Sequence, residues 1–228
     1  MLRIVVPVKS SPQAKSRLAA VLTDAQRRAL VEAMVRRTLL VARAAAPAAE
    51  IVLVSNSADF RVMAESMGAR AIADQGMGFN EALAIADATS RADDAMLVLP
   101  ADLPLLAAAD VAAMLGVITD CAIAPDRVRD GTNALFWRRA PRIFRFGLGS
   151  FSAHLRAARE QGGIVQIVER PGLAFDLDDP QDLCNLRSTG FSPTLVALAK
   201  APGPAIARQG LKSRVGPKDQ ASDAPARK

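Results

Sequence analysis

Residues 97–106 read Leu-Val-Leu-Pro-Ala-Asp-Leu-Pro-Leu-Leu, and the fold can be worked out from this stretch. The apolar run from Ala95 to Leu99 is typical of a buried strand in a parallel sheet, and Pro100 ends it because proline lacks the N–H that a strand needs. Asp102 is therefore expected just beyond the carboxyl end of a strand, where open α/β sheets bind ligands. It could ligate a metal ion or cap a helix starting near Ala107, and this stretch alone does not separate the two.

Strands and helices alternate on both sides of this stretch. Apolar β-branched runs predict strands, while helical spacing of apolar residues and a Thr-x-x-Gln capping box at Thr23 predict helices. The alternation indicates a doubly wound, mostly parallel α/β sheet, and 228 residues suit one such domain. The expected strands are 4–8, 50–54, 69–73, 95–99, 121–125, 135–137 and 164–168. The expected helices are 24–47, 58–67, 80–90, 107–117, 153–161 and one beginning at 179.

Composition predicts a cytoplasmic protein without a membrane partner. The sequence contains no apolar run of membrane-spanning length and no signal-peptide pattern. Its two cysteines, Cys121 and Cys184, are too few for a disulfide framework or a zinc site.

The net charge of +6 by itself suggests a nucleic-acid partner, but the charge is concentrated at one end of the chain. Five of these six charges lie beyond residue 199, in a segment rich in Pro and Gly. We therefore expect residues 1–190 to form the domain and residues 191–228 to form a basic, disordered tail that binds polyanions weakly. Residues 191–200 could instead dock on the domain or on a second subunit, so a homodimer stays open.

A loop carrying three cations follows the first strand. Pro7 and Val8 stand at the strand end, and the loop of residues 9–17 follows them directly. Its cations, Lys9, Lys15 and Arg17, together suit the phosphates of a nucleotide. An ordinary solvated loop is the alternative.

Two further segments combine glycine with polar residues ahead of a helix. Gly78 and Asn80 could approach a base or ribose, although a turn capped by Asn80 would look the same. The stretch from Gly147 to Ser150 could present backbone N–H groups to a phosphate, although an N-cap by serine is also consistent with it. His154, the only histidine, is expected to pack or to support a site from behind rather than to act as a catalytic base.

A second pair of carboxylates lies late in the chain. Asp176 and Asp178 project to the same face of an extended segment, where they repel one another unless a cation lies between them. Asp179 and Asp182 have sufficient roles at the start of the following helix. We therefore expect only the first two to join Asp102 as metal ligands.

Taken together, these motifs resemble the guanylyltransferases of coenzyme F420 biosynthesis, which are related to the molybdenum-cofactor nucleotidyltransferases. The resemblance covers residues 2–186 and depends on five motifs in order. They are Pro7-Val8-Lys9 with residues 15–18, residues 99–105, residues 125–127 with 131–135, residues 146–154, and Asp176-Leu177-Asp178 with Pro180.

The resemblance implies a three-layer α/β/α sandwich around a mixed, mostly parallel sheet, a Rossmann-like nucleotidyltransferase fold. It implies transfer of GMP from GTP to 3-phospho-D-glycerate, phosphoenolpyruvate or 2-phospho-L-lactate. Mg²⁺ would be held by Asp102, Asp176 and Asp178. The acceptor would be bound by Thr132, Asn133, Gly147 and Ser150, and the nucleotide by Pro7, Lys9, Lys15, Arg17, Gly78, Asn80 and Pro100. Catalysis would depend on Asp102 and the three cations.

Two departures from the family pattern stand out. Arg129-Asp130 replaces the usual Gly-Thr pair, which bears on the identity of the acceptor, and Phe79 replaces a usual Leu, which bears on contacts to the base.

Two alternative functions stay open. One is another nucleotidyltransferase, for molybdopterin or cytidylyl transfer. The other is a nucleic-acid-binding protein acting through its tail, although the sequence has eight Phe, one Trp and no Tyr and lacks a basic-aromatic motif.

Overall fold

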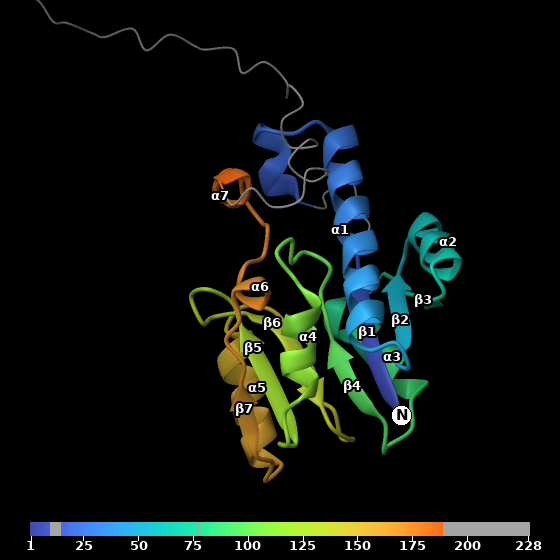
Figure 1. The fold of residues 1–228 in the computed structure, drawn as a ribbon, viewed down its shortest axis with the longest axis vertical. Coiled ribbons are helices and arrows are strands. Elements are labelled where there is room, and N and C mark those ends of the chain that lie inside the picture. Colours follow the sequence, from blue (N-terminus) through green and yellow to red (C-terminus); the bar gives the residue numbers. More distant parts are fainter. Residues whose placement is uncertain (10–14, 77, 189–228) are drawn as a thin grey trace, which may run out of the picture.

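The computed structural model describes residues 1–9, 15–76 and 78–188 and places a seven-stranded sheet between helices (Figure 1). The strand order is β3-β2-β1-β4-β6-β5-β7. The strands are β1 (Leu2–Val8), β2 (Glu50–Ser55), β3 (Arg70–Ala73), β4 (Ala95–Val98), β5 (Cys121–Pro125), β6 (Thr132–Trp137) and β7 (Val165–Ile167). The helices are η1 (Ser16–Ala20), α1 (Asp24–Ala45), α2 (Ala58–Ser66), α3 (Phe79–Ala88), α4 (Ala108–Leu115), α5 (Ser150–Glu160), α6 (Pro171–Ala174) and α7 (Pro180–Ser188).

The sheet is mixed and mostly parallel, as predicted. β1 pairs in parallel with β2 and β4, and β5 pairs in parallel with β7. β6 lies antiparallel between β4 and β5. The reversal has a simple cause, because the six residues 126–131 can turn the chain into a hairpin but cannot make a parallel crossover.

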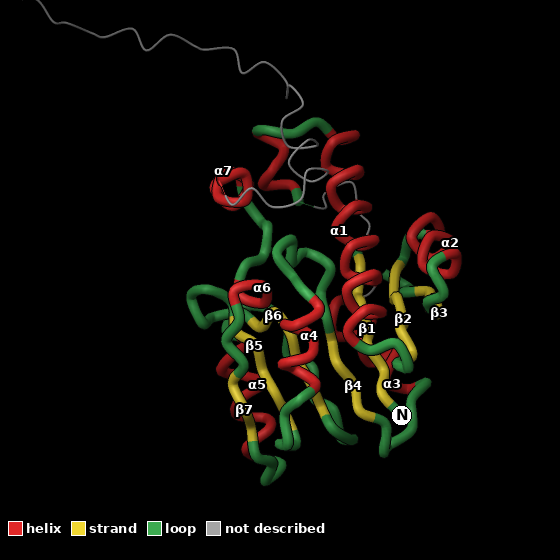
Figure 2. The backbone as a smooth tube through the Cα atoms, in the orientation of Figure 1, coloured by secondary structure: helices red, strands yellow, loops and turns green. Residues whose placement is uncertain are grey.

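Side-chain alternation along the strands gives the sheet a separate core on each face. Ile4 and Val6 of β1 pack with α1 and α4, whereas Val5 faces α3 and α5. The tube view shows the same arrangement, with α1 and α4 in front of the sheet and α3 and α5 behind it (Figure 2). The predicted three-layer sandwich is thereby confirmed.

A third, smaller core lies beside the sheet and joins distant parts of the chain. It is formed by Leu18 and Leu22 near η1, the first half of α1, and the segment from Phe175 to Leu186. Burial of these apolar side chains holds the late Asp176–Asp178 segment against η1 and α1.

Several helices and strands begin at residues other than the predicted ones. The predicted helix 153–161 begins earlier, at Ser150, and the predicted strand 135–137 begins at Thr132. Neither η1 nor α6 was expected, because both are shorter than two helical turns and carry little periodicity. The predicted tail, residues 191–228, lies outside the described residues. Across the described residues, no helix combines the length and apolar character that a membrane span needs.

Candidate active site

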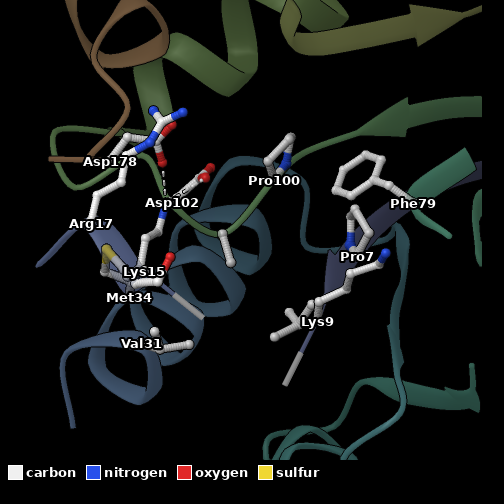
Figure 3. A pocket seen from close by; sticks show the side chains of 13 residues that line it. Pro7, Lys9, Lys15, Arg17, Val31, Met34, Phe79, Pro100, Asp102 and Asp178 are labelled. Atoms are coloured by element: carbon white, nitrogen blue, oxygen red, sulfur yellow. Dashed lines mark hydrogen bonds and ion pairs between the residues drawn. The ribbon is translucent and has the colours of Figure 1, made fainter. Parts of the chain in front are cut away.

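A cavity of about 360 Å³ opens where β1 and β4 reach their carboxyl ends (Figure 3). Its walls come from the end of β1, the start of η1, one side of α1, the first residue of α3 and the segment after β4. This is the sheet edge at which ligands of α/β proteins bind. The lining residues are Pro7, Val8, Lys9, Lys15, Ser16, Arg17, Val31, Met34, Phe79, Pro100, Ala101, Asp102 and Asp178.

The three predicted phosphate-binding cations all line this cavity, on two sides of it. Lys9 lies beside Phe79, whereas Lys15 and Arg17 lie near Asp178 across the cavity (Figure 3). Residues 10–14 of the same loop lie outside the described residues. Positive charge on both sides of the cavity suits an extended anion such as a triphosphate.

The backbone on both sides of Asp102 is fixed. Leu99 donates its N–H to the carbonyl of Val5 at 2.9 Å, which is the last β1–β4 bond before the chain turns. Leu103 is 1% exposed and anchors the chain after the turn. The N–H of Leu177 donates to the Asp102 carbonyl at 3.0 Å, which brings the late acidic segment directly beside Asp102.

The alternative role of Asp102, as cap of the following helix, is wrong. α4 begins after Ala107, whose N–H donates to the carboxylate of Asp110 at 2.9 Å. Asp110 is thus the residue that satisfies a free donor at the start of α4, and Asp102 is left available to the cavity.

The Lys15 ammonium joins two of the predicted metal ligands. Its Nζ lies 2.9 Å from Asp102 Oδ2 and 2.7 Å from Asp178 Oδ1. The Lys15 backbone is left-handed, with φ of 53°, and its side chain is 13% exposed. Burial by itself lowers the pKa of Lys15, but the charges of Asp102 and Asp178 outweigh this effect and raise it above its ordinary value. The ammonium therefore stays charged and shields the two carboxylates from one another.

Asp176 completes the acidic cluster. Asp176 and Asp178 flank Leu177, which is fully buried, so both carboxylates turn away from the core. Burial raises the pKa of Asp176, and the charges of Asp102 and Asp178 raise it further. Within the ranges that the structure describes, no three acidic, His or Cys side chains converge closely enough to hold one ion. Instead, Lys15 lies between two of the three carboxylates.

The predicted acceptor residues gather at a second place, outside the cavity lining. Thr132 pairs with Pro125 at the carboxyl end of β5, and its Oγ1 lies 2.9 Å from Nδ1 of His154 in α5. Gly147 and Ser150 are joined by a hydrogen bond of 3.2 Å from the Ser150 N–H to the Gly147 carbonyl. Gly147 has a φ of 134°, which favours glycine at this turn. Thr132 and Ser150 are both buried.

Asn133 links this second place to the acidic cluster. Its side chain lies near enough to Asp176 to oppose the rise in the pKa of that carboxyl. Its Nδ2 is nevertheless buried without a hydrogen bond of regular geometry. A buried amide donor without such a bond is costly and suits an additional acceptor atom.

The anion site predicted at the start of α5 is partly filled by the protein itself. The Gly149 N–H donates to the Asp130 carboxylate at 3.1 Å, and the Phe151 N–H donates to the Asp130 carbonyl at 3.0 Å. Arg129, with φ of 59°, pairs with Glu169 and lies over the Phe151 ring. The unusual Arg-Asp pair thus fastens the β5–β6 loop to α5.

Asn80 has a structural role that its sequence position did not reveal. Its Nδ2 donates to the Phe146 carbonyl at 3.0 Å, and its Oδ1 accepts from the Phe146 N–H at 2.8 Å. Gly78 precedes α3, and a Cβ there would lie 1.9 Å from the Glu81 carboxylate. Neither Gly78 nor Asn80 lines the cavity, so their contact with a nucleotide stays a prediction.

Other residues of the site were not found from sequence. Val31 and Met34 lie in the helix expected at 24–47, for which the sequence indicated no functional role, yet both line the cavity. Arg127 lies over the Phe175 ring and pairs with Asp182 at 2.6 Å, which holds the acidic segment to the β5–β6 loop. In the sequence, the motif Pro125-Asp126-Arg127 was the feature that could have indicated the role of Arg127.

Known proteins resemble this chain along most of its length. The family described as "Guanylyl transferase CofC like" matches residues 2–192. A phosphoenolpyruvate guanylyltransferase of Rubrobacter xylanophilus is 44% identical over 192 residues, which make up 82% of this chain and 93% of the relative. A 3-phospho-D-glycerate guanylyltransferase of Phenylobacterium zucineum is 38% identical over 191 residues, 80% of this chain and 88% of the relative.

Solved structures share the fold. A protein from Desulfovibrio desulfuricans described as a nucleotide-diphospho-sugar transferase superposes with a TM-score of 0.66 at 19% identity, over 87% of this chain and 96% of that one. At this identity the likeness concerns the fold alone.

The family match covers most of the chain, and the Rubrobacter relative exceeds 40% identity. The chain therefore belongs to the family of CofC-like guanylyl transferases.

Proposed function

We propose that this protein transfers GMP from GTP to a small phosphorylated three-carbon acid and releases pyrophosphate, as a step of coenzyme F420 biosynthesis. The candidate acceptors are phosphoenolpyruvate, 3-phospho-D-glycerate and 2-phospho-L-lactate. Relatives similar over most of their length bear the first two of these names, so the names do not decide between acceptors.

The observation that carries the proposal is the position of the Lys15 ammonium between Asp102 and Asp178. It supports a cation-binding role for the acidic cluster, directly beside a cavity lined by Lys9 and Arg17. A nucleotidyl transfer needs this combination, with cations along the phosphates and carboxylates for a metal ion.

The three carboxylates fit Mg²⁺ by their chemistry, because Mg²⁺ prefers oxygen ligands and combines one or two carboxylates with phosphate oxygens. Asp102, Asp176 and Asp178 would hold it. Burial raises the pKa of Asp176, and the charges of Asp102 and Asp178, which a divalent ion would neutralise, raise it further. When bound, Mg²⁺ would supply positive charge to the nucleotide phosphates.

The reaction itself needs little acid–base chemistry from the protein. A phosphate oxygen of the acceptor forms a bond to the α-phosphorus of GTP, the bond from that phosphorus to the bridging oxygen breaks, and its electron pair leaves with pyrophosphate. The attacking phosphate is largely ionised at neutral pH, since its second pKa is about 6. We assign Lys9, Lys15 and Arg17 to the triphosphate and Thr132, Asn133, Gly147 and Ser150 to the acceptor.

We further propose that residues 1–190 suffice for this activity and that the protein works in the cytoplasm. Residues 2–192 are the part that the family matches, which supports this division of the chain.

Pyrophosphate release tests the proposal. The full chain is incubated with Mg²⁺, with GTP or CTP, and with each of the three acids in turn. We expect release with GTP and one acid, and none when a chelator removes the metal. Release with CTP but not GTP would overturn the guanylyl assignment, and release without any of the acids would overturn the acceptor class.

A further inference from the structure

His154 is fully buried and lies between the two halves of the proposed acceptor pocket. It belongs to α5, one turn after Ser150, and its ring packs edge-on against Phe146 at 4.8 Å between centroids. The proposed reaction does not use this histidine, yet both of its ring nitrogens have hydrogen-bond partners.

The two ring nitrogens have different roles. Nε2 accepts the backbone N–H of Arg145 at 2.8 Å, so it carries no proton of its own. In a neutral ring the proton then belongs to Nδ1, which lies 2.9 Å from the Thr132 hydroxyl oxygen. We assign the Nδ1–H tautomer on this pattern. Burial and the charge of Arg145 lower the pKa of His154 to about 4, which agrees with a neutral ring.

This tautomer decides how the Thr132 hydroxyl can act. Since its oxygen accepts from His154, its own proton is directed elsewhere. The same ring anchors Arg145, two residues before Gly147, and so restrains the turn that leads to Ser150. One buried side chain thus fixes both Thr132 on β6 and the Gly147 turn before α5.

We propose that His154 is a positioning residue of the acceptor site, whose neutral ring directs the Thr132 hydroxyl as a donor to the phosphate of the acid. The inference extends the proposed function and depends on it. His154 makes no contact with the acceptor in this role. It acts by holding a donor in place before binding, which reduces the ordering cost of recognition.

The tautomer of His154 can be determined without an assay of enzyme activity. Because the sequence contains one histidine, full-length protein labelled with ¹⁵N-histidine gives one pair of ring nitrogen signals. We expect a protonated Nδ1 and a bare Nε2 at pH 7. The opposite tautomer, or a positively charged ring, would overturn the inference even if the enzyme transfers GMP.

Matched variants separate the two hydrogen bonds. His154→Asn places an amide N–H near Nδ1 and keeps a donor for Thr132, whereas His154→Phe removes both bonds and keeps a ring. We expect His154→Phe to raise the KM for the active acid about tenfold, with the KM for GTP nearly unchanged. His154→Asn should recover most of the loss. Equal rises in both KM values would indicate a structural role and overturn the inference.

A double-mutant comparison tests whether His154 acts through Thr132. Thr132→Val removes the hydroxyl and keeps the shape of the side chain. If the inference is correct, His154→Phe weakens binding of phosphoenolpyruvate or 3-phospho-D-glycerate less in the Thr132→Val chain than in the unaltered chain, and what remains is the loss through the Arg145 bond. Additive losses, measured by calorimetry on the folded variants, would show that His154 acts independently. Should the unaltered chain show no transfer to any acid, the proposed function fails, whatever the tautomer.

Discussion

The ammonium of Lys15 lies 2.7 Å from the carboxylate of Asp178, although 163 residues separate them along the chain. The same ammonium contacts Asp102, so one side chain joins the loop after β1, the segment after β4 and the acidic segment before α7. A cation at this point offsets the repulsion between two carboxylates, which a metal ion could also do.

Removing this cation should destabilise the metal-free protein. We expect Lys15→Met to reduce the free energy of unfolding by about 1–2 kcal/mol without metal, because two partly buried carboxylates lose their partner. Added Mg²⁺ should restore more stability to this variant than to the unaltered chain, as urea titrations would show. Lys9→Met, on the other side of the cavity, is the control and should respond little. An equal gain in stability on adding Mg²⁺ to both variants would show that Lys15 is not part of the metal site.

The carboxylates should be needed for turnover. Asp102→Asn and Asp178→Asn each keep the side-chain size but remove an anionic ligand, so pyrophosphate release should fall about 10²-fold or more. Asp93→Asn, an exposed carboxylate in the turn before β4, controls for the change in net charge and should be near normal. Near-normal turnover in both site variants would remove these residues from the mechanism.

Ser150 should distinguish the acceptor from the nucleotide. Ser150→Ala removes one hydroxyl from the start of α5, and we expect affinity for the phosphorylated acid to fall about tenfold. Affinity for GTP should change little, because Ser150 does not line the cavity beside Lys9 and Lys15. Calorimetry with each ligand separately provides the measurement. A matching loss of GTP affinity would place Ser150 at the nucleotide or in the general support of the fold.

Acid should destabilise the fold partly through His154. Its pKa is about 4 in the folded chain against an ordinary 6.5, so the unfolded chain binds more protons between these values. The free energy of unfolding should fall as pH drops from about 6.5 to about 4, by roughly 3 kcal/mol at most. In His154→Gln this part of the pH dependence should vanish, while the loss from carboxylates at lower pH remains. An unchanged profile in the variant would contradict a neutral buried ring.

The parts of the fold that depend on local sequence could be predicted. Thr23 and Gln26 form the expected capping box at α1, because its hydrogen bonds lie within one turn. The buried run before Pro100 became β4 and brought Asp102 to the expected edge of the sheet. Asp176 and Asp178, which were expected on one face of an extended segment, flank buried Leu177 in a segment that forms neither strand nor helix.

Features that depend on contacts between distant segments could not be predicted. No spacing indicates that Lys15 pairs with Asp178, since the third core has to form first. Nor does the sequence show that Asp130 accepts hydrogen bonds from the N–H groups of Gly149 and Phe151, at the helix start where a phosphate was expected. Both features depend on how the loops cross the sheet edge, and loop paths have no periodicity.

The basic C-terminal segment provides the last prediction. Most of the net charge lies beyond residue 199, and the family match ends at residue 192, so a chain cut after Lys200 should keep full turnover. Its affinity for DNA or heparin should fall, since binding to phosphates without sequence preference scales with the number of Lys and Arg and weakens with salt. A second cut, after Gly190, tests residues 191–200, which could pack on the domain or on a second subunit. Turnover, melting temperature and sedimentation are compared for both cuts. Lower stability in only the chain that ends at Gly190 would assign residues 191–200 to the domain or to a dimer interface. Loss of turnover in the chain that ends at Lys200 would show that the tail takes part in the reaction.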